Sequence, residues 1–311
     1  MPLMMDTYRV GLLLTERCDI RCSHCWLGDN REKDMTTEEA RGYIDQAATI
    51  PTVEWISFTG GEPFLVPRLL TDLVAYASEK KLRTEVVTNC NWGTTKKEAE
   101  KRLGELQNAG LEAINLSCDD FHQRYIPFSR VKNCFEAAKG LDLNIVIMSA
   151  ANKSRTLGID EITRRLGSEE IKILGKEDQP KRFAALAVET GFIPAGRGAV
   201  LPEEERVLGE SSVEGACPLV LRDVGVNPQG YLLACCSASI ILDAFKLGNL
   251  KKEKMGDIIE GAGRTPLFET LMDLGPYNLA NELGLKGEFV NRCHACYEAV
   301  RHPNLSGILS G

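Results

Sequence analysis

Short apolar runs alternate with amphipathic stretches from Tyr8 to about Thr190, and this alternation restricts the fold more than any other feature of the sequence. The apolar runs, each a candidate strand, are YRVGLLL, VEWISF, TEVVT, AINLS, NIVIMS and FAALAV. The stretches between them have helical periodicity over residues 37–48, 67–80, 96–109, 129–139 and about 159–166. Thr36 with Glu39 and Thr95 with Glu98 predict side-chain caps at the starts of two of these helices. Six strands alternating with helices predict parallel pairing through right-handed crossovers. The alternation therefore predicts an α/β fold, either a doubly wound sheet or a partial barrel.

The alternation stops after Ala195, and the sequence predicts a boundary there. The glycines, the proline and the acidic residues between positions 196 and 205 are typical of a linker. We therefore expect two units, a larger one over residues 1–200 and a smaller one over residues 201–311.

A net charge of -7, from 37 Lys and Arg against 44 Asp and Glu, limits the partners that the chain can bind. An acidic protein repels polyphosphate at long range, so we expect no nucleic acid among the partners. No window reaches the roughly 18 uninterrupted apolar residues of a membrane span, and MPLMMDTYRV lacks the apolar run of a signal peptide. The expected location is the cytoplasm.

Eleven cysteines form two groups with a sparse region between them. A reducing cytoplasm keeps thiols free for metals or catalysis, so we expect metal sites rather than disulfides. The positions are 18, 22 and 25, then 90, 118 and 134 singly, then 217, 235, 236, 293 and 296.

The first group is CDIRCSHC, in the loop after the first candidate strand. The thiolates of Cys18, Cys22 and Cys25 can hold three irons of a cubane 4Fe–4S cluster and leave the fourth iron open. An open iron is a place to bind a ligand. The residues alone also allow a tetrahedral zinc site, with water or His24 as the fourth ligand.

Gly60, Gly61, Glu62 and Pro63 follow the second candidate strand. Two glycines let the backbone approach a ligand closely, and the proline stiffens the loop. The Glu62 carboxylate offers an acceptor for an ammonium group. Two glycines before a helix also form ordinary turns, so this segment becomes informative only beside the cysteine group.

Together these two segments resemble the radical S-adenosylmethionine (SAM) superfamily, in which an aromatic-type residue precedes the last cysteine of the triad. The resemblance implies a partial (βα)6 barrel of the TIM type over residues 8 to about 195. It also implies that the open iron chelates SAM and that the reduced cluster cleaves SAM to methionine and a 5′-deoxyadenosyl radical. Glu62 and the backbone of Gly60 and Gly61, beside Pro63, would hold the SAM ammonium.

The resemblance extends to the carboxyl ends of the later strands, where βα barrels place their active sites. Capping and turn chemistry is the alternative for the polar residues after the fourth and fifth strands. The residues that the resemblance implies near SAM are Asn89, Ser117, Asp119, Asn152 and Arg197.

The second cysteine group spans a predicted hairpin and a distant CHAC segment. DVGVNPQGYLLACC predicts two strands around a turn in which Gly230 adopts positive φ at low cost, and a helix is expected over residues 255–260. Four thiolates suffice for a zinc ribbon or for a fully ligated 4Fe–4S cluster. The spacing is similar to SPASM and Twitch auxiliary domains of radical SAM enzymes, which implies one auxiliary cluster. Its ligands would be Cys217, Cys235, Cys293 and Cys296.

Four cysteines remain without a metal role. Cys134 lies in a predicted helix and is interpreted as a buried apolar side chain. Cys236, Cys118 and Cys90 are candidate hydrogen-atom donors near the substrate, with ordinary packing as the alternative. Cys236, next to Cys235, is also a candidate alternative ligand of the auxiliary cluster. His122, in the segment after Asp119, is interpreted as loop structure rather than as a general base.

The predicted function is that of a radical SAM oxidoreductase with two 4Fe–4S clusters. The predicted substrate is a ribosomally made peptide, modified by crosslinking, thioether formation or epimerisation, although no leader-binding domain precedes the first strand. The alternatives are dehydrogenation or epimerisation of a small molecule such as an aminoglycoside or a sugar alcohol, and a non-enzymatic zinc-ribbon protein. An electron donor such as flavodoxin or ferredoxin is the expected protein partner.

Overall fold

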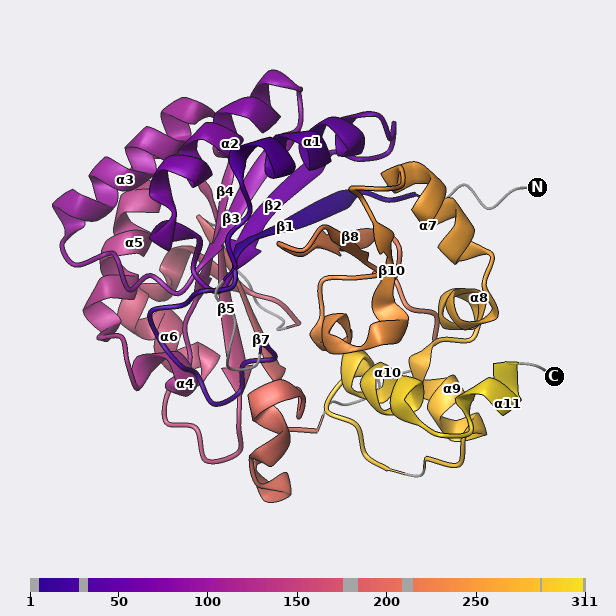
Figure 1. Ribbon diagram of the computed structural model, residues 1–311. Helices are drawn as coiled ribbons and strands as arrows, with labels where there is room; N and C mark the ends of the chain where they lie inside the picture. Colours follow the sequence, from indigo (N-terminus) through magenta and orange to yellow (C-terminus); the bar gives the residue numbers. More distant parts are fainter. Residues whose placement is uncertain (1–5, 28–32, 176–183, 209–214, 286, 310–311) are drawn as a thin grey trace.

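The structure, a computed structural model, describes residues 6–27, 33–175, 184–208, 215–285 and 287–309, and a single mixed sheet organises it (Figure 1). The sheet has ten strands in the order β10-β9-β8-β1-β2-β3-β4-β5-β7-β6. The strands are β1 Arg9–Thr15, β2 Trp55–Gly60, β3 Arg83–Thr88, β4 Ala113–Ser117, β5 Asn144–Ala151, β6 Ile171–Ile173, β7 Ala185–Gly191, β8 Asp223–Val226, β9 Tyr231–Leu233 and β10 Lys246–Asn249.

Parallel pairing joins every neighbouring pair from β8 to β6, whereas β9 pairs antiparallel with both β8, its partner in the predicted hairpin, and β10. This confirms the α/β class and the parallel pairing. The edge strands β10 and β6 do not pair with each other, so the sheet does not close into a full barrel within the described residues. All six predicted strands are present. The three-residue β6 was not predicted, because so short a run carries no periodicity.

Helices follow most of the strands and cover the outer face of the sheet (Figure 1). Two begin at predicted caps: the Thr36 side chain accepts from the Glu39 backbone in α1, and Thr95 accepts from Glu98 in α3. The helices are α1 Thr37–Ala48, α2 Pro67–Glu79, α3 Lys96–Ala109, α4 Asp120–Gln123, α5 Phe128–Gly140, α6 Ile159–Leu166, α7 Met255–Gly263, α8 Pro266–Asp273, α9 Pro276–Glu282, α10 Arg292–Arg301 and α11 Leu305–Leu309.

Strand β8 joins the C-terminal part of the chain to the N-terminal part. It pairs in parallel with β1, from Arg9 opposite Asp223 to Leu12 opposite Val226. The apolar core between sheet and helices therefore includes residues beyond position 200, such as Met255. A second apolar core packs beneath α8, α9 and α10. The division into residues 1–200 and 201–311 stays a prediction, and a sheet that runs across it connects the two expected units.

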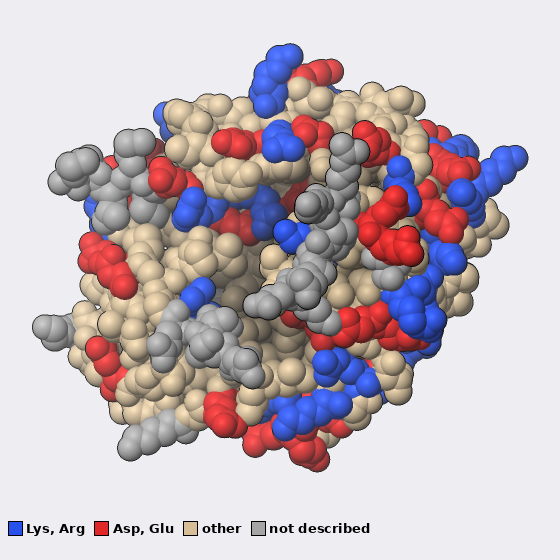
Figure 2. Space-filling model, turned by 180° about the vertical axis from the view of Figure 1, so that it is seen from behind, with Lys and Arg blue, Asp and Glu red and all other residues tan. Residues whose placement is uncertain are grey.

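The two faces of the sheet differ in composition. Val10, Leu12 and Leu14 of β1 belong to the helix-covered core. Because side chains alternate along a strand, Arg9 and Gly11 lie on the opposite, inner face. Figure 2 shows that the molecule is hollowed near its centre, with charged side chains of both signs around the hollow. Within the described residues, no helix is both long and apolar enough to cross a membrane.

Candidate active site at the cysteine loop

Residues 18–25, here called the cysteine loop, carry the first cysteine group. Cys18 is exposed, Cys25 is half-buried and Cys22 is buried. Cys22 packs in a small apolar cluster with Phe121 of helix α4 and with Phe192, which follows β7. The loop is thus seated on residues from the carboxyl ends of distant strands, as βα barrels arrange their active sites.

Gly60 and Gly61 support the first half of the cysteine loop. The Gly61 amide donates to the Thr15 carbonyl over 2.7 Å, and the Glu62 amide donates to the Arg17 carbonyl over 2.9 Å. A Cβ on Gly61 would lie 2.0 Å from the Arg17 oxygen, and one on Gly60 would lie 2.3 Å from the Thr15 oxygen. These glycines therefore allow a close approach to the backbone that leads into the cysteine loop.

Arg197 and its flanking glycines support the second half of the cysteine loop. The Arg197 amide donates to the Cys25 carbonyl over 3.0 Å, and its guanidinium donates to the carbonyls of Cys22 and Leu27 over 2.9 and 3.2 Å. A Cβ on Gly196 would lie 2.3 Å from the Trp26 oxygen. Two glycine-containing segments thus hold the cysteine loop from its two ends.

Glu62 is 1% exposed, and its carboxylate has three donors from its own chain. Oε1 accepts from the Phe64 amide over 3.1 Å and from the Thr88 hydroxyl over 2.9 Å, while Oε2 accepts from the Asn89 amide over 2.8 Å. Burial raises the pKa of Glu62 to about 7, although these hydrogen bonds oppose the shift. Oε2 accepts a single bond here, so it keeps capacity for one further donor.

Asn89 connects the end of β3 to the cysteine loop. Its amide nitrogen Nδ2 donates to the Asp19 carboxylate over 2.9 Å and lies 3.7 Å from the Cys18 sulfur. Pro63 begins a short 3-10 helix, Pro63–Leu65, in which the Phe64 ring stacks on Trp92 at 3.9 Å between centroids. The predicted residues 60–63 and Asn89 therefore converge on one end of the cysteine loop.

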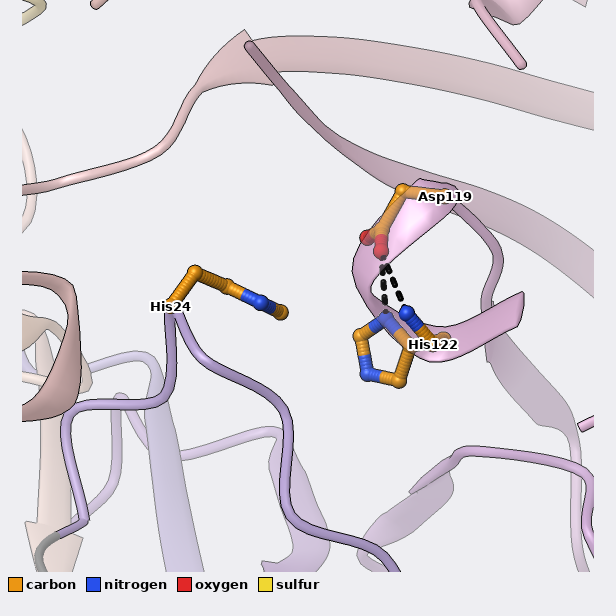
Figure 3. A group of neighbouring side chains, drawn as sticks. All are labelled: His24, Asp119 and His122. Atoms are coloured by element: carbon orange, nitrogen blue, oxygen red, sulfur yellow. Dashed lines mark hydrogen bonds and ion pairs between the residues drawn. The ribbon is translucent and has the colours of Figure 1, made fainter. Parts of the chain in front are cut away.

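Asp119 is 2% exposed and holds the start of α4 against β5. Its Oδ1 accepts from the backbone amide and ring Nδ1 of His122, over 2.9 and 2.8 Å (Figure 3). Its Oδ2 accepts from the Ala150 amide over 3.1 Å. Burial alone would raise the pKa of Asp119, but the His122 charge and hydrogen bonds outweigh it and lower this pKa to about 2.

Two histidines lie beside Asp119. Burial lowers the pKa of His24 to about 4, and its ring lies 4.6 Å from Phe121 between centroids. Burial also lowers the pKa of His122, but the charge and the hydrogen bond of Asp119 raise it well above its usual value. The sequence analysis, which interpreted His122 as loop structure, did not predict its ion pair with Asp119.

Asn152 and Ser117 occupy strand ends as predicted. Asn152 Nδ2 donates to the Ser154 hydroxyl and to the Glu205 carboxylate, each over 2.9 Å, and its buried Oδ1 has no partner among the described atoms. Ser117 is the last residue of β4 and is half-buried. Because Leu116 belongs to the helix-covered core, Ser117 lies on the inner face.

The second cysteine group gathers in the C-terminal core. Cys217 precedes β8, Cys235 follows β9, and Cys293 and Cys296 lie three residues apart on α10, on one face of that helix. The pKa of the Cys235 thiol is raised to about 12, by burial first and by the neighbouring sulfurs of Cys293 and Cys217. Its sulfur lies 3.3 Å from the Ser237 hydroxyl. The structure therefore brings the predicted ligands together from three separate segments.

Cys236 turns to the inner face of the sheet. Its thiol donates to the Val224 carbonyl over 3.3 Å, and a Cβ on Gly11 would lie 2.8 Å from its sulfur. The residue is exposed, yet burial of the sulfur, followed by the Asp223 charge, raises its pKa well above the usual value. The exposure of the residue and the burial of its sulfur are compatible if the backbone of Cys236 faces solvent while the sulfur lies over β1. The thiol therefore stays protonated at neutral pH.

Cys90 and Cys118 lie elsewhere than the sequence analysis expected. Both are 0% exposed and belong to the core between the sheet and the helices, not to the inner face. Burial raises the pKa of the Cys118 thiol, and burial with a Cys134 hydrogen bond raises that of Cys90. Their surroundings favour packing over hydrogen donation, because a core thiol cannot reach a substrate on the other face.

The sequence analysis did not predict a group of charged side chains that lies around Arg9 on the inner face of the sheet. Arg9 donates to both oxygens of Asp223, and it also donates to Glu85 over 2.8 Å. Glu85 Oε2 accepts from the Asn115 amide over 3.2 Å. Charged residues inside otherwise apolar strands, as in YRVGLLL and TEVVT, were the signal that could have indicated this group.

Residues 12–164 match the Radical SAM superfamily. The parallel sheet, the cysteine loop and this match define the class: residues 12–164 form a domain of the radical SAM superfamily, whose members are enzymes that bind SAM and a 4Fe–4S cluster. This confirms the predicted family and the prediction of an enzyme. It also sets aside the zinc-ribbon protein that the residues alone allowed.

Several characterised or named proteins are similar in sequence. YydG of Bacillus subtilis (strain 168), whose name refers to peptide biosynthesis, is 25% identical over 238 residues, or 74% of this chain and 70% of YydG. PqqA peptide cyclase of Xanthomonas campestris pv. campestris (strain 8004) is 27% identical over 80% of this chain and 72% of the cyclase. Fe-coproporphyrin III synthase of Methanosarcina barkeri is 31% identical, but the match covers 64% of this chain and 47% of the synthase.

Solved structures share the fold at low sequence identity. Native anSMEcpe with bound AdoMet and Cp18Cys peptide has a TM-score of 0.58 at 12% identity, and the match covers 97% of this chain and 99% of anSMEcpe. BtrN in complex with AdoMet and 2-DOIA has a TM-score of 0.55 at 15% identity, over 86% of this chain and 88% of BtrN. At these identities the likeness shows the fold alone, and it agrees with the predicted partial barrel.

Proposed function

We propose that this enzyme modifies a ribosomally made peptide by radical chemistry. Two relatives with peptide-related names, YydG and PqqA peptide cyclase, align with 74% and 80% of the chain. These alignments extend past the 153 residues from 12 to 164 of the family match. A small molecule such as an aminoglycoside or a sugar alcohol remains the alternative substrate class.

The cysteine loop would hold the SAM-binding cluster through Cys18, Cys22 and Cys25. SAM on a reduced 4Fe–4S cluster supplies a 5′-deoxyadenosyl radical, and the protein supplies placement and exclusion of water. Glu62, Asn89 and Asp119 would act from the surrounding strand ends, together with Ser117, Asn152 and Arg197. The bonds of Asn89 to Asp19 and of Arg197 to the carbonyls of Cys22 and Cys25 support this assignment.

The second cysteine group would hold an auxiliary 4Fe–4S cluster. No three cysteines among the described residues have all their sulfurs within 4.8 Å of one another. A tetrahedral zinc site needs about 3.8 Å between sulfurs, from Zn–S bonds of about 2.3 Å. Within the described residues, neither cysteine group therefore has its sulfurs preassembled for a tetrahedral zinc ion.

The proposed reaction is epimerisation at a peptide α-carbon, with Cys236 as the hydrogen-atom donor. Once the α-hydrogen atom had been removed, the protonated Cys236 thiol would give its hydrogen atom to the opposite face of the carbon radical. The S–H bond breaks as the new C–H bond forms. The resulting thiyl radical regains the thiol by taking one electron from a low-potential reductant and one proton from solvent. This step is supported by one observation: the Cys236 sulfur lies over Gly11 on the inner face of the sheet.

A low-potential electron carrier such as flavodoxin or ferredoxin would supply these electrons. We propose a cytoplasmic location for the enzyme. All eleven cysteines are free thiols in the structure, which is the state that a reducing compartment maintains.

Turnover in deuterated water tests the epimerisation step. The enzyme is incubated anaerobically with SAM, reductant and the short peptides encoded beside its gene, and an aminoglycoside panel tests the alternative substrate class. A peptide product one mass unit heavier, absent with Cys236→Ala but formed with Cys118→Ala and Cys90→Ala, supports the proposal. A product two hydrogens lighter that all three variants form at the wild-type rate would contradict it and indicate dehydrogenation or crosslinking.

Iron analysis tests the two cluster assignments. The anaerobic protein should hold about eight irons, in two four-iron clusters. Replacing Cys18, Cys22 and Cys25 together by Ala should leave about four irons and abolish SAM cleavage. Replacing Cys293 and Cys296 by Ala should lower the iron content and block product formation, while some formation of 5′-deoxyadenosine continues. Persistent SAM cleavage by the triple variant would overturn the first assignment.

A further inference from the structure

Strands β5 and β7 place four apolar side chains on the inner face of the sheet. The residues that alternate with them belong to the helix-covered core: Ile145, Ile147, Ala185 and Ala187. Because side chains alternate along a strand, the residues between and after these point to the opposite face. The four inner-face residues, here called the apolar wall, are Val146, Met148, Leu186 and Val188. In-register pairing places Met148 beside Val188 and makes the wall continuous.

Nothing in the part of the chain that the structure describes fully covers the apolar wall. Met148 is 44% exposed, although its strand lies inside the sheet with a neighbour on each side. The other three residues are half-buried. Removing such side chains from water is favourable, and contiguous exposed apolar surface marks binding sites. The wall is therefore a surface that a ligand can cover.

The apolar wall lies next to the cysteine loop. Ala150, the next inner-face residue of β5 after Met148, packs against the small apolar cluster that contains Cys22. On the neighbouring strand β4, Ser117 is the in-register partner of Met148. The cysteine loop and Ser117 are the groups assigned above to the SAM-binding cluster and to SAM. The occupant of the wall is therefore the substrate of this site rather than a second protein.

The rest of the inner face is polar. The side chains that β8, β1, β2, β3 and β4 place there include Asp223, Arg9, Ser57, Glu85 and Asn115. A substrate in the hollow (Figure 2) would meet these polar groups on one side and the apolar wall on the other. A molecule with hydroxyl or ammonium groups on every side would leave some of them unpaired against the wall. A peptide unit with an apolar side chain suits both sides.

We propose that the apolar wall binds the side chain of the substrate residue whose α-hydrogen atom is removed, and that this residue is therefore apolar. Met148 is the specificity-determining residue, because it is the most exposed member of the wall and pairs with Ser117. The inference rests on the proposed peptide substrate, and it adds the class of residue that is modified.

Tandem mass spectrometry of the peptide that the holoenzyme modifies tests the proposal. Fragment masses locate the modified residue whether the reaction is epimerisation, crosslinking or dehydrogenation, so failure of the proposed reaction does not decide this test. We expect Val, Ile, Leu, Met or Phe at that position. Modification of a charged or hydroxyl-bearing residue, or turnover of an aminoglycoside alone, would overturn the proposal.

A specificity reversal separates binding by the wall from a loss of structure. Met148→Glu should lower kcat/KM for this peptide about tenfold or more. The same variant should turn over the peptide with Lys at the modified position better than the wild-type enzyme does, because the new carboxylate can pair with the ammonium group. A variant that is merely misfolded would lose activity on both peptides.

Ile308→Glu is the matched control. Ile308 is a large apolar residue of similar exposure, 37% against 44% for Met148, and it lies on α11, away from β5 (Figure 1). This variant should keep the wild-type kcat/KM for both peptides. Equal effects of the two substitutions would overturn the proposal.

A binding measurement tests the wall without a known substrate. Holoenzyme with 13C-methyl methionine and oxidised clusters is titrated with N-acetyl-leucine amide or N-acetyl-serine amide in the presence of SAM, and the resonance missing from Met148→Leu identifies Met148. The leucine probe should shift this resonance more than the serine probe does. A shift with SAM alone and none on adding the leucine probe would assign the wall to SAM and overturn the proposal. A leucine-probe shift without turnover of any peptide would count against the proposed reaction and support the wall as a binding site.

Discussion

Arg197, Glu62 and Asp119 show what single polar residues contribute to this site. Each was expected near SAM, and each also makes hydrogen bonds that hold the chain itself. Their polar atoms therefore organise the cysteine loop and the strand ends before any ligand binds. Substituting them should change the stability of the protein as well as the affinity for SAM.

Arg197→Ala should lower the free energy of unfolding of the apoprotein by about 2 kcal/mol. The guanidinium donates to the carbonyls of Cys22 and Leu27, and bonds from charged donors contribute about 1.5–3 kcal/mol. Urea unfolding measures this loss. Arg124→Ala is the control, since Arg124 is exposed and has no ion pair within the described part of the chain. Equal stability of the two variants would show that Arg197 does not hold the loop.

Glu62 should make the apoprotein less stable as the pH rises. Its folded pKa of about 7 lies above the unfolded value of 4.5, so the folded state binds more protons between these values. The stabilisation is complete below about pH 4.5 and is lost as the pH rises through about 7, on the order of 3 kcal/mol in total. Urea unfolding from pH 5 to 8 should show this decline, and Glu62→Gln should remove it. A parallel decline in the variant would assign the effect to another group.

At the scale of elements, glycines allow two loops, one after β2 and one after β7, to lie close to the backbone at the two ends of the cysteine loop. The segment after β2 contacts the backbone before Cys18, and the segment after β7 contacts the backbone after Cys22. Both loops follow parallel strands, so both start at the same edge of the sheet. The short helix α4 lies at that edge as well and supplies His122.

Gly61→Ala should disrupt the cysteine loop and lower the iron content. The added Cβ would lie 2.0 Å from the Arg17 carbonyl oxygen, so one of the two backbones must shift. Iron analysis after anaerobic reconstitution measures the effect. Gly42→Ala is the control, because nothing lies within 4 Å of that Cβ and the change in α1 should stabilise the protein by up to about 1 kcal/mol. Full iron in Gly61→Ala would contradict the role of this glycine.

At the scale of the whole molecule, one sheet links the cysteine loop to the C-terminal cysteine group. Parallel pairing of β1 with β8 places Gly11 beside Gly225 and leaves room for the Cys236 sulfur. The Arg9 group on the same face joins β1, β3 and β8. The two cysteine-bearing parts are therefore held in a fixed relation by sheet pairing and by buried charge.

Arg9→Met should destabilise the apoprotein by about 3–5 kcal/mol, because it leaves two buried carboxylates without their cation. The side chains of Glu85 and Asp223 are 9% and 10% exposed. Lys96→Met is the comparison, since the Lys96–Glu136 pair is exposed and should cost less than about 1 kcal/mol. Urea unfolding of both variants provides the measurement. Similar losses would show that the Arg9 group does not hold β8 in the sheet.

Local patterns in the sequence were enough for the class of fold, the six strands, two helix caps and the residue types of both cysteine groups. Alternation of apolar residues, capping boxes and cysteine spacing are properties of neighbouring residues, so they can be seen without a structure. Local patterns do not show which face of the sheet a side chain occupies, and for this reason Cys90 and Cys118 were expected on the wrong face. Which face a side chain occupies at a strand end depends on how the chain leaves the sheet.

Contacts between distant residues were decided by the tertiary structure alone. The pairing of β8 with β1 and the Cys236 sulfur over Gly11 join residues about 200 or more positions apart. No periodicity links such residues, because their proximity depends on strand order and register in the sheet. The sequence by itself therefore determined the chemistry that the chain carries, whereas sheet topology decided which of those groups meet.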